Sequence, residues 1–177
     1  MAIKQIIRVL ESSSKFKSWR ENNKKAYLSY IFKTFEKNDN DDWQLGYYEP
    51  DNDALATFTV TKSNVELQDN QEVFKKTEKK VPKLEIEKVT IGYGKAQEIA
   101  KTFQKESYKN EIAGKIIIIL QNLESYGQIW NITYVTLAFN TLNIKIDASS
   151  GKVLHHELSS LLNLAKNDLV NALKKKT

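Results

Sequence analysis

A chain of 177 residues is long enough for one domain, or for one small domain with an extension. Its composition is 41% hydrophobic and 28% charged, with 6 Gly and 2 Pro, which excludes collagen-like, low-complexity and disordered classes. The chain contains no Cys, and its two histidines are His155 and His156. Disulfide scaffolds, thiol nucleophiles and zinc-thiolate sites are therefore excluded, and most histidine chemistry with them.

The sequence predicts a cytoplasmic protein with no membrane partner. Its longest purely apolar run, residues 116–120, is far shorter than the roughly 18 to 20 residues of a spanning helix. The N-terminus interrupts its apolar residues with Lys4 and Arg8 and lacks the small-residue cleavage site of a signal peptide.

Charge is unevenly distributed along the chain. The net charge is +5, but residues 1–38 carry +6 and residues 39–53 carry −6. A basic N-terminal region is thus followed at once by an acidic loop, which weakens the net charge as an argument for nucleic-acid binding.

Three helices and a hairpin are predicted in the N-terminal half. Apolar residues at spacings of three and four predict helices over 2–11 and 15–37, with residues 12–14 as a break and N-cap. Strands are expected at 43–49 and 55–61, because Pro50 to Asp53 has the composition of a turn. A Lys-rich helix is expected over 69–80, ending before Pro82.

The C-terminal half is predicted to be a helix followed by strands. A helix over 95–107 presents Ala96, Ile99, Ala100 and Phe103 as one apolar stripe. Strands are expected at 114–123, 128–139 and 141–147, with a short extension at 152–156 and a final amphipathic helix over 157–174.

A tight turn at Asn140 and Thr141 would place Phe139 beside Leu142 and Val135 beside Ile146. That register gives an apolar face for the helix to cover, with Trp130 on a mixed opposite face. The strand over 116–120 is apolar on both faces, so the N-terminal half is expected to pack over part of the second face.

Residues 90–156 resemble the PepSY domain family. The resemblance lies in the helix with its Ala positions, the three strands that follow, and the phrase Asp147-Ala148-Ser149-Ser150-Gly151-Lys152-Val153-Leu154. It implies a helix packed on a three-stranded antiparallel sheet, and a small non-catalytic module that inhibits or regulates peptidases. In the final turn, Asp147 can accept bonds from backbone amides and Gly151 can supply a positive φ.

Catalytic and metal-binding patterns are weak. Gly92 to Lys95 precedes a helix but lacks a phosphate-loop spacing, and His155 and His156 point to opposite faces of a strand. Two pairs of carboxylates are close in sequence, Glu85 with Glu87 and Asp51 with Asp53, but no sequence feature indicates that either pair lies in a catalytic cleft. The sequence therefore predicts a protein that is not an enzyme and that has no catalytic, cofactor-binding or metal-binding residues.

Two sets of residues are candidates for binding. Large amphipathic rings suit protein interfaces, so the protein-binding candidates are Trp43, Tyr47, Tyr48, Trp130 and Tyr134. Burial of these rings in the core is the competing interpretation. Basic residues that alternate with aromatic ones in the N-terminal helical region could bind nucleic acid weakly through its phosphates; these candidates are Lys15, Lys17, Arg20, Lys24 and Lys25. A solvated, Lys-rich helix face is the competing interpretation.

The sequence as a whole predicts one α+β domain, residues 1–177, with helices packed on an antiparallel sheet. Residues 1–89 would form N-terminal helices plus a hairpin, and residues 90–177 a PepSY-like helix, three-stranded sheet and C-terminal helix. The predicted function is a non-catalytic module that binds or regulates an unknown protein partner, such as a peptidase. The alternative is a weak, non-specific nucleic-acid binder.

Overall fold

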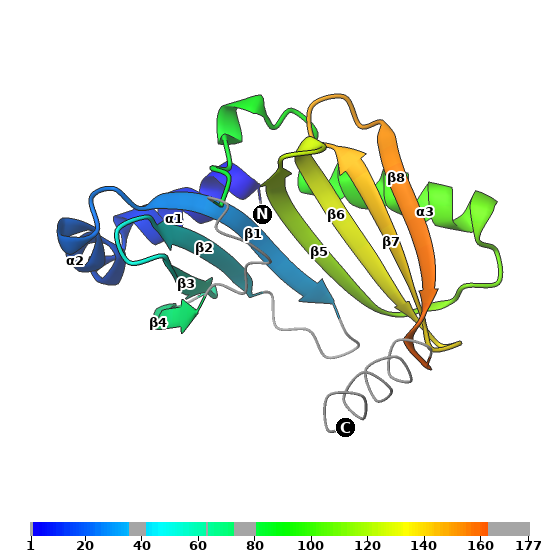
Figure 1. Ribbon diagram of the computed structural model, residues 1–177, viewed down its shortest axis with the longest axis horizontal. Helices are drawn as coiled ribbons and strands as arrows, with labels where there is room; N and C mark the ends of the chain where they lie inside the picture. Colours follow the sequence, from blue (N-terminus) through cyan, green and yellow to red (C-terminus); the bar gives the residue numbers. More distant parts are fainter. Residues whose placement is uncertain (1, 36–41, 63, 73–80, 163–177) are drawn as a thin grey trace, which may run out of the picture.

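The computed structural model describes residues 2–35, 42–62, 64–72 and 81–162. Over these residues the chain forms helices α1 (Ile3–Ser12), α2 (Ser14–Asn22) and α3 (Tyr93–Ser107), a short 3-10 helix η1 (Ile86–Lys88), and the strands β1 (Tyr27–Phe35), β2 (Trp43–Glu49), β3 (Ala54–Val60), β4 (Val65–Glu72), β5 (Ala113–Leu123), β6 (Gly127–Thr136), β7 (Asn140–Asp147) and β8 (Val153–Ser160). All strand pairs are antiparallel, and the sheet order is β4-β3-β2-β1-β5-β6-β7-β8 (Figure 1). The predicted α+β class with an antiparallel sheet is confirmed.

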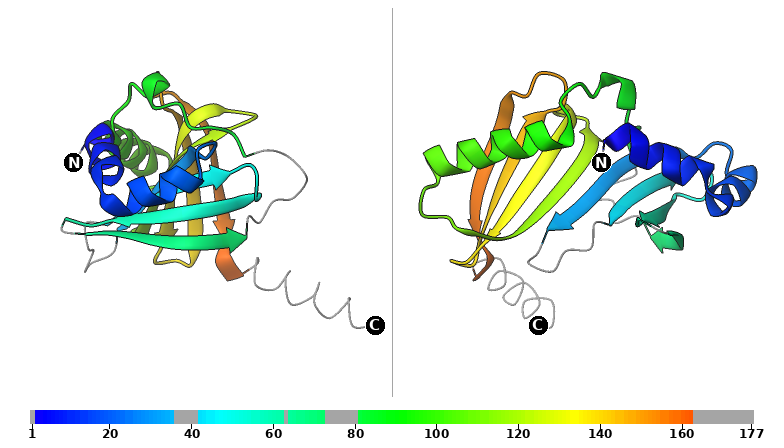
Figure 2. Two further views of the ribbon diagram at one scale, coloured as in Figure 1. Left: turned by 90° about the vertical axis from the view of Figure 1, so that its left-hand side faces the viewer. Right: turned by 180° about the vertical axis from the view of Figure 1, so that it is seen from behind.

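The sheet consists of two halves joined edge to edge. In each half, helical residues precede a run of four sequential antiparallel strands: α1 and α2 before β1–β4, and α3 before β5–β8. The first strands of the two halves, β1 and β5, pair with each other through the register Phe32 to Ile119. Viewed from behind, α1, α2 and α3 all lie on the same face of the sheet (Figure 2).

Strand register relates the two halves by an approximate twofold axis. Ile31 pairs with Leu45 in the first half, and Ile118 pairs with Ile132 in the second, at one constant offset in sequence. Phe32 and Ile119 are separated by that same offset and pair with each other, so the axis passes through this pair. The same offset relates two further residues of β2 to their counterparts on β6, namely Trp43 to Trp130 and Tyr47 to Tyr134.

The helix predicted over 15–37 is wrong beyond residue 22. Ser13 caps α2 as expected, because its side chain accepts a hydrogen bond from the Phe16 N–H at 3.2 Å. The helix then ends at Asn22, and residues 27–35 form β1. Aromatic and β-branched residues favour a strand there, and pairing with both β2 and β5 overrides the helical spacing of the same side chains.

Two further predicted helices are wrong at their first four residues, which belong to strands. Residues 69–72 belong to β4 and residues 157–160 to β8, because each segment pairs with the neighbouring hairpin strand. The rest of those predicted helices, residues 73–80 and 163–174, lies outside the described residues, as do residues 36 and 37. The hairpin of β2 and β3, the helix α3 and the strands β5 to β7 are confirmed with small shifts at their ends.

The predicted register of the β6–β7 hairpin is wrong by an odd number of residues, which exchanges the two faces. Leu142 pairs with Tyr134 rather than with Phe139, since the turn is formed by residues 137–139. The Phe139 N–H donates to the carbonyl of Thr136 at 3.1 Å, and Phe139 has a φ of 57°. Trp130 therefore lies on the helix-covered face.

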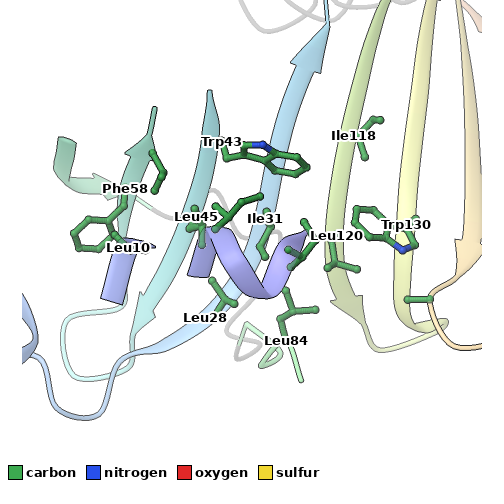
Figure 3. Close-up of a cluster of buried hydrophobic side chains, with 14 of the residues drawn as sticks. Leu10, Leu28, Ile31, Trp43, Leu45, Phe58, Leu84, Ile118, Leu120 and Trp130 are labelled. Atoms are coloured by element: carbon green, nitrogen blue, oxygen red, sulfur yellow. The ribbon is translucent and has the colours of Figure 1, made fainter. Parts of the chain in front are cut away.

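One hydrophobic core runs beneath the helices of both halves. It extends from Phe58 on β3 to Trp130 on β6, with Ile31 and Leu120 at the junction of β1 and β5 (Figure 3). The N-terminal half thus continues the sheet and does not cover its second face, which corrects the prediction. On that second face Ile117 and Ile119 are half-buried beside strand neighbours.

The turn after β7 has the geometry that its sequence predicts. Asp147 Oδ1 accepts hydrogen bonds from the N–H and Oγ of both Ser149 and Ser150, and Gly151 has a φ of 77°. These bonds favour the charged carboxylate and lower the pKa of Asp147 to about 2. The Ala148 carbonyl accepts bonds from the N–H groups of Thr90 and Ile91, so the turn also anchors the segment before α3.

We expect Asp147→Asn to lower the free energy of unfolding by about 1 kcal/mol at pH 7, because the turn is partly solvated. The folded-state pKa is depressed, so the carboxylate stabilises the fold above pH 4 and this contribution is lost as the pH falls toward 2. Urea denaturation between pH 7 and pH 3 measures this. The difference between wild type and variant should shrink on acidification, and a difference independent of pH would contradict the assignment. Asp51→Asn, which removes an exposed pair with Lys25, is the control.

Candidate functional site

The five aromatic residues predicted as protein-binding candidates are all buried. Trp43, Tyr47, Trp130 and Tyr134 lie beneath the helices, and Tyr48 lies on the other face, where its hydroxyl donates to Asp53. Burial raises the pKa of Tyr134 to about 12. These side chains build the core, so they offer no protein-binding surface; burial was the competing interpretation of the sequence.

The basic candidates are spread over α2 and the turn that follows it. Lys15, Lys17, Lys24 and Lys25 are exposed, and Lys25 pairs with Asp51 at 2.9 Å. Arg20 turns inward and donates from Nη1 to the carbonyls of Asn23 and Ala26. Because α2 ends at Asn22, these residues do not form one continuous basic helix.

The predicted geometry of the two histidines is confirmed. His156 pairs with Ile144 on the helix-covered face and accepts or donates a bond at 2.6 Å with the Tyr108 hydroxyl, whereas His155 pairs with Lys145 on the other face. Among residues 2–35, 42–62, 64–72 and 81–162, no three His, Asp or Glu side chains are grouped to hold a metal ion.

A cluster of exposed apolar side chains lies at one end of the C-terminal half. It is formed by Ile112, Leu137, Phe139 and Leu162, which are 61% to 67% exposed and which we call the apolar tip. The Leu137 N–H donates to the Ile112 carbonyl, and the Leu161 N–H donates to the Phe139 carbonyl, both at 2.9 Å. These bonds bring the β6–β7 turn, the start of β5 and the end of β8 together.

The apolar tip is held in place by polar contacts at its base. The Asn140 side chain donates to Glu111 Oε1 at 3.0 Å, and its backbone N–H donates to the Thr136 hydroxyl at 3.2 Å. Phe139 adopts a left-handed conformation that Gly or Asn normally occupies in a turn. A bulky ring is thus presented to solvent at a conformational cost.

A cavity of about 640 Å³ lies at the other end of the strands, in the N-terminal half. It is bounded by α1, α2, the start of β1 and the segment 83–87. Arg8 and Arg20, the two arginines of the chain, both line it. The Leu84 N–H donates to the Leu28 carbonyl at 2.8 Å, which fixes that segment beside β1.

Neither of these two sites was predicted from the sequence. The alternation of the predicted strand over 128–139 places residues 137 and 139 on the covered face. The turn predicted at Asn140 and Thr141 lies directly after the observed one at residues 137–139, so the sequence locates the turn closely but not its register. No local signal joins Arg8 to Arg20 or to Lys83, since their proximity depends on tertiary packing.

Comparisons with known proteins give the fold and little else. No family model matches the chain, and no curated protein matches it. A crystal structure of a protein described as a "putative lipoprotein" from Clostridium difficile 630 is similar, with a TM-score of 0.52 and 18% identity. The match covers 82% of this chain and 90% of that one, so it includes both halves of the sheet. At this identity the likeness shows the fold alone. None of the described helices is long and apolar enough to span a membrane.

Proposed function

We propose that the protein is a non-catalytic binding module that contacts a partner protein through the apolar tip. The observation that carries the proposal is Phe139, a bulky residue 64% exposed at a φ of 57°. A turn optimised only for folding would place Gly or Asn there, because a non-Gly residue in this conformation costs roughly 1 to 2 kcal/mol. Binding of an apolar partner surface would offset that cost.

The apolar tip also has the rigidity of a contact surface. Four large apolar side chains from three segments are gathered there, and hydrogen bonds at their base fix the backbone. Preorganisation of this kind reduces the entropy lost on association. The resemblance of residues 90–156 to PepSY domains adds peptidases as the class of partner to test first; that choice rests on the sequence.

We expect Phe139→Asn to raise the free energy of unfolding by up to about 1 kcal/mol, since Asn accepts the left-handed conformation and the lost ring is exposed. The double variant Leu137→Ser with Phe139→Asn should nonetheless lose partner retention. Quantitative affinity capture at moderate salt compares it with wild type and with Val9→Gln, which removes an exposed apolar residue of α1.

Retention of a protein by wild type and by the Val9 control, reduced about tenfold in the double variant, supports the proposal. Absence of any protein whose retention depends on the apolar tip overturns it.

A further inference from the structure

The cavity of the N-terminal half combines an apolar floor with a charged wall. Ile7, Leu28 and Leu84 contribute to the floor, and seven charged side chains contribute to the wall. Its volume of about 640 Å³ is within the range of sites for small organic molecules.

Two of the acidic residues are neutralised by neighbouring lysines. Glu87 pairs with Lys4 at 3.1 Å, and Glu85 pairs with Lys88 at 2.6 Å. Arg8, Glu11, Arg20 and Lys83 are the other charged residues of the lining.

The remaining charges do not balance. Arg8, Arg20 and Lys83 are positive, and Glu11 is negative. Among the residues described, Arg8, Lys83 and Glu11 make no ion pair with one another or with other side chains. The cavity therefore carries a surplus of two positive charges.

Arg20 is held ready for an anion. Its Nη1 donates to the carbonyls of Asn23 and Ala26, at the end of α2. Those bonds fix the plane of the guanidinium group. Both are made by Nη1, so the N–H groups on Nη2 and Nε are not used in them. A fixed guanidinium favours bidentate binding of an anionic group.

A tyrosine side chain also lines the cavity. Tyr47 is 4% exposed and lines the cavity, with Glu11 and Arg20 as the charged groups that act on its hydroxyl. In the described part of the chain, no group forms a hydrogen bond with that hydroxyl. The hydroxyl is therefore available to donate a hydrogen bond to a ligand in the cavity.

We propose that this cavity binds a small phosphate monoester with an apolar body, the phosphate lying between Arg8, Arg20 and the Tyr47 hydroxyl. A phosphate monoester carries about −1.5 to −2 charges at pH 7, which matches the surplus. A carboxylate would leave one positive charge without compensation. The apolar body would lie on Ile7, Leu28 and Leu84.

Calorimetric titration with phenyl phosphate tests the proposal, with phenylacetate and inorganic phosphate as parallel titrants. We expect phenyl phosphate to bind, and both comparison anions to bind at least about tenfold more weakly. Tyr47→Phe and Arg8→Gln should each weaken phenyl phosphate by about tenfold. Tyr47→Phe should leave the melting temperature of the free protein unchanged or higher, because it removes a hydroxyl without a partner.

The chain offers a matched control for each variant. Tyr134→Phe removes an equally buried hydroxyl at the twofold-related position, away from the cavity, and Lys101→Gln removes a positive charge on the exposed side of α3. Both should bind phenyl phosphate as wild type does. Absence of binding at millimolar concentration overturns the proposal, as does equal loss in the controls. Equal binding of phenylacetate overturns the assignment to phosphate. None of these outcomes depends on the apolar tip.

Discussion

Replacing Trp130 with Ala is expected to lower the free energy of unfolding by about 4 kcal/mol. The Trp130 side chain is fully buried on β6, and its Nε1–H donates to the Ile91 carbonyl at 2.8 Å. It therefore joins the sheet to the segment that leads into α3. Truncation would leave a large cavity and an unpaired carbonyl in the same place.

Trp130→Phe separates these two contributions. It keeps most of the ring volume but removes the N–H, so a loss of about 2 kcal/mol is expected. Trp19→Phe is the matched control, because Trp19 is also buried and its Nε1–H has no hydrogen-bond partner in the described part of the chain. Urea denaturation followed by circular dichroism measures both. Equal losses in the two variants would contradict the role given to the bond with Ile91.

Replacing Gly46 with Ala is expected to destabilise the fold by about 2 kcal/mol. A Cβ at Gly46 would lie 2.0 Å from Cε1 of Tyr30, whose ring covers this position of β2 from the adjacent strand. To make room, Tyr30 must move and lose the 3.0 Å hydrogen bond between its hydroxyl and Thr57.

The same substitution at Gly94 provides the control for Gly46→Ala. No atom lies within 4 Å of a Cβ added at Gly94, in the first turn of α3, so Gly94→Ala should stabilise the protein by up to about 1 kcal/mol. In a Tyr30→Ala background, Gly46→Ala should lose most of its effect. A penalty that persists without the Tyr30 ring would show that the clash is not its cause.

Trp43 and Trp130 belong to a short sequence similarity whose meaning becomes clear only from the pairing of the strands. In the sequence they share one aromatic pattern, which alternating strand residues would produce equally well. In the structure they lie at positions related by the approximate twofold axis, because Ile31 and Ile118 pair with equivalent partners. The N-terminal half is thus a second four-stranded unit preceded by two helices, whereas the sequence predicts three helices and a hairpin.

The sequence by itself determined the features that depend on neighbouring residues. The N-cap at Ser13, the β2–β3 hairpin, the apolar stripe of α3 and the Asp147 turn are set by local hydrogen bonds and side-chain spacing. PepSY membership, the cytoplasmic location and the absence of catalysis remain predictions.

Only the tertiary structure decided the rest. Residues 27–35 have a helical spacing and a strand composition, and pairing with β5, far away in sequence, selects the strand. The observed register of the β6–β7 hairpin differs from the predicted one by an odd number of residues. Trp130 therefore lies in the core and Phe139 is exposed to solvent. The packing of α1, α2 and the segment 83–87 around the start of β1 places Arg8 and Arg20 at one cavity. Strand pairing and packing act between distant residues, so local periodicity carries no information about them.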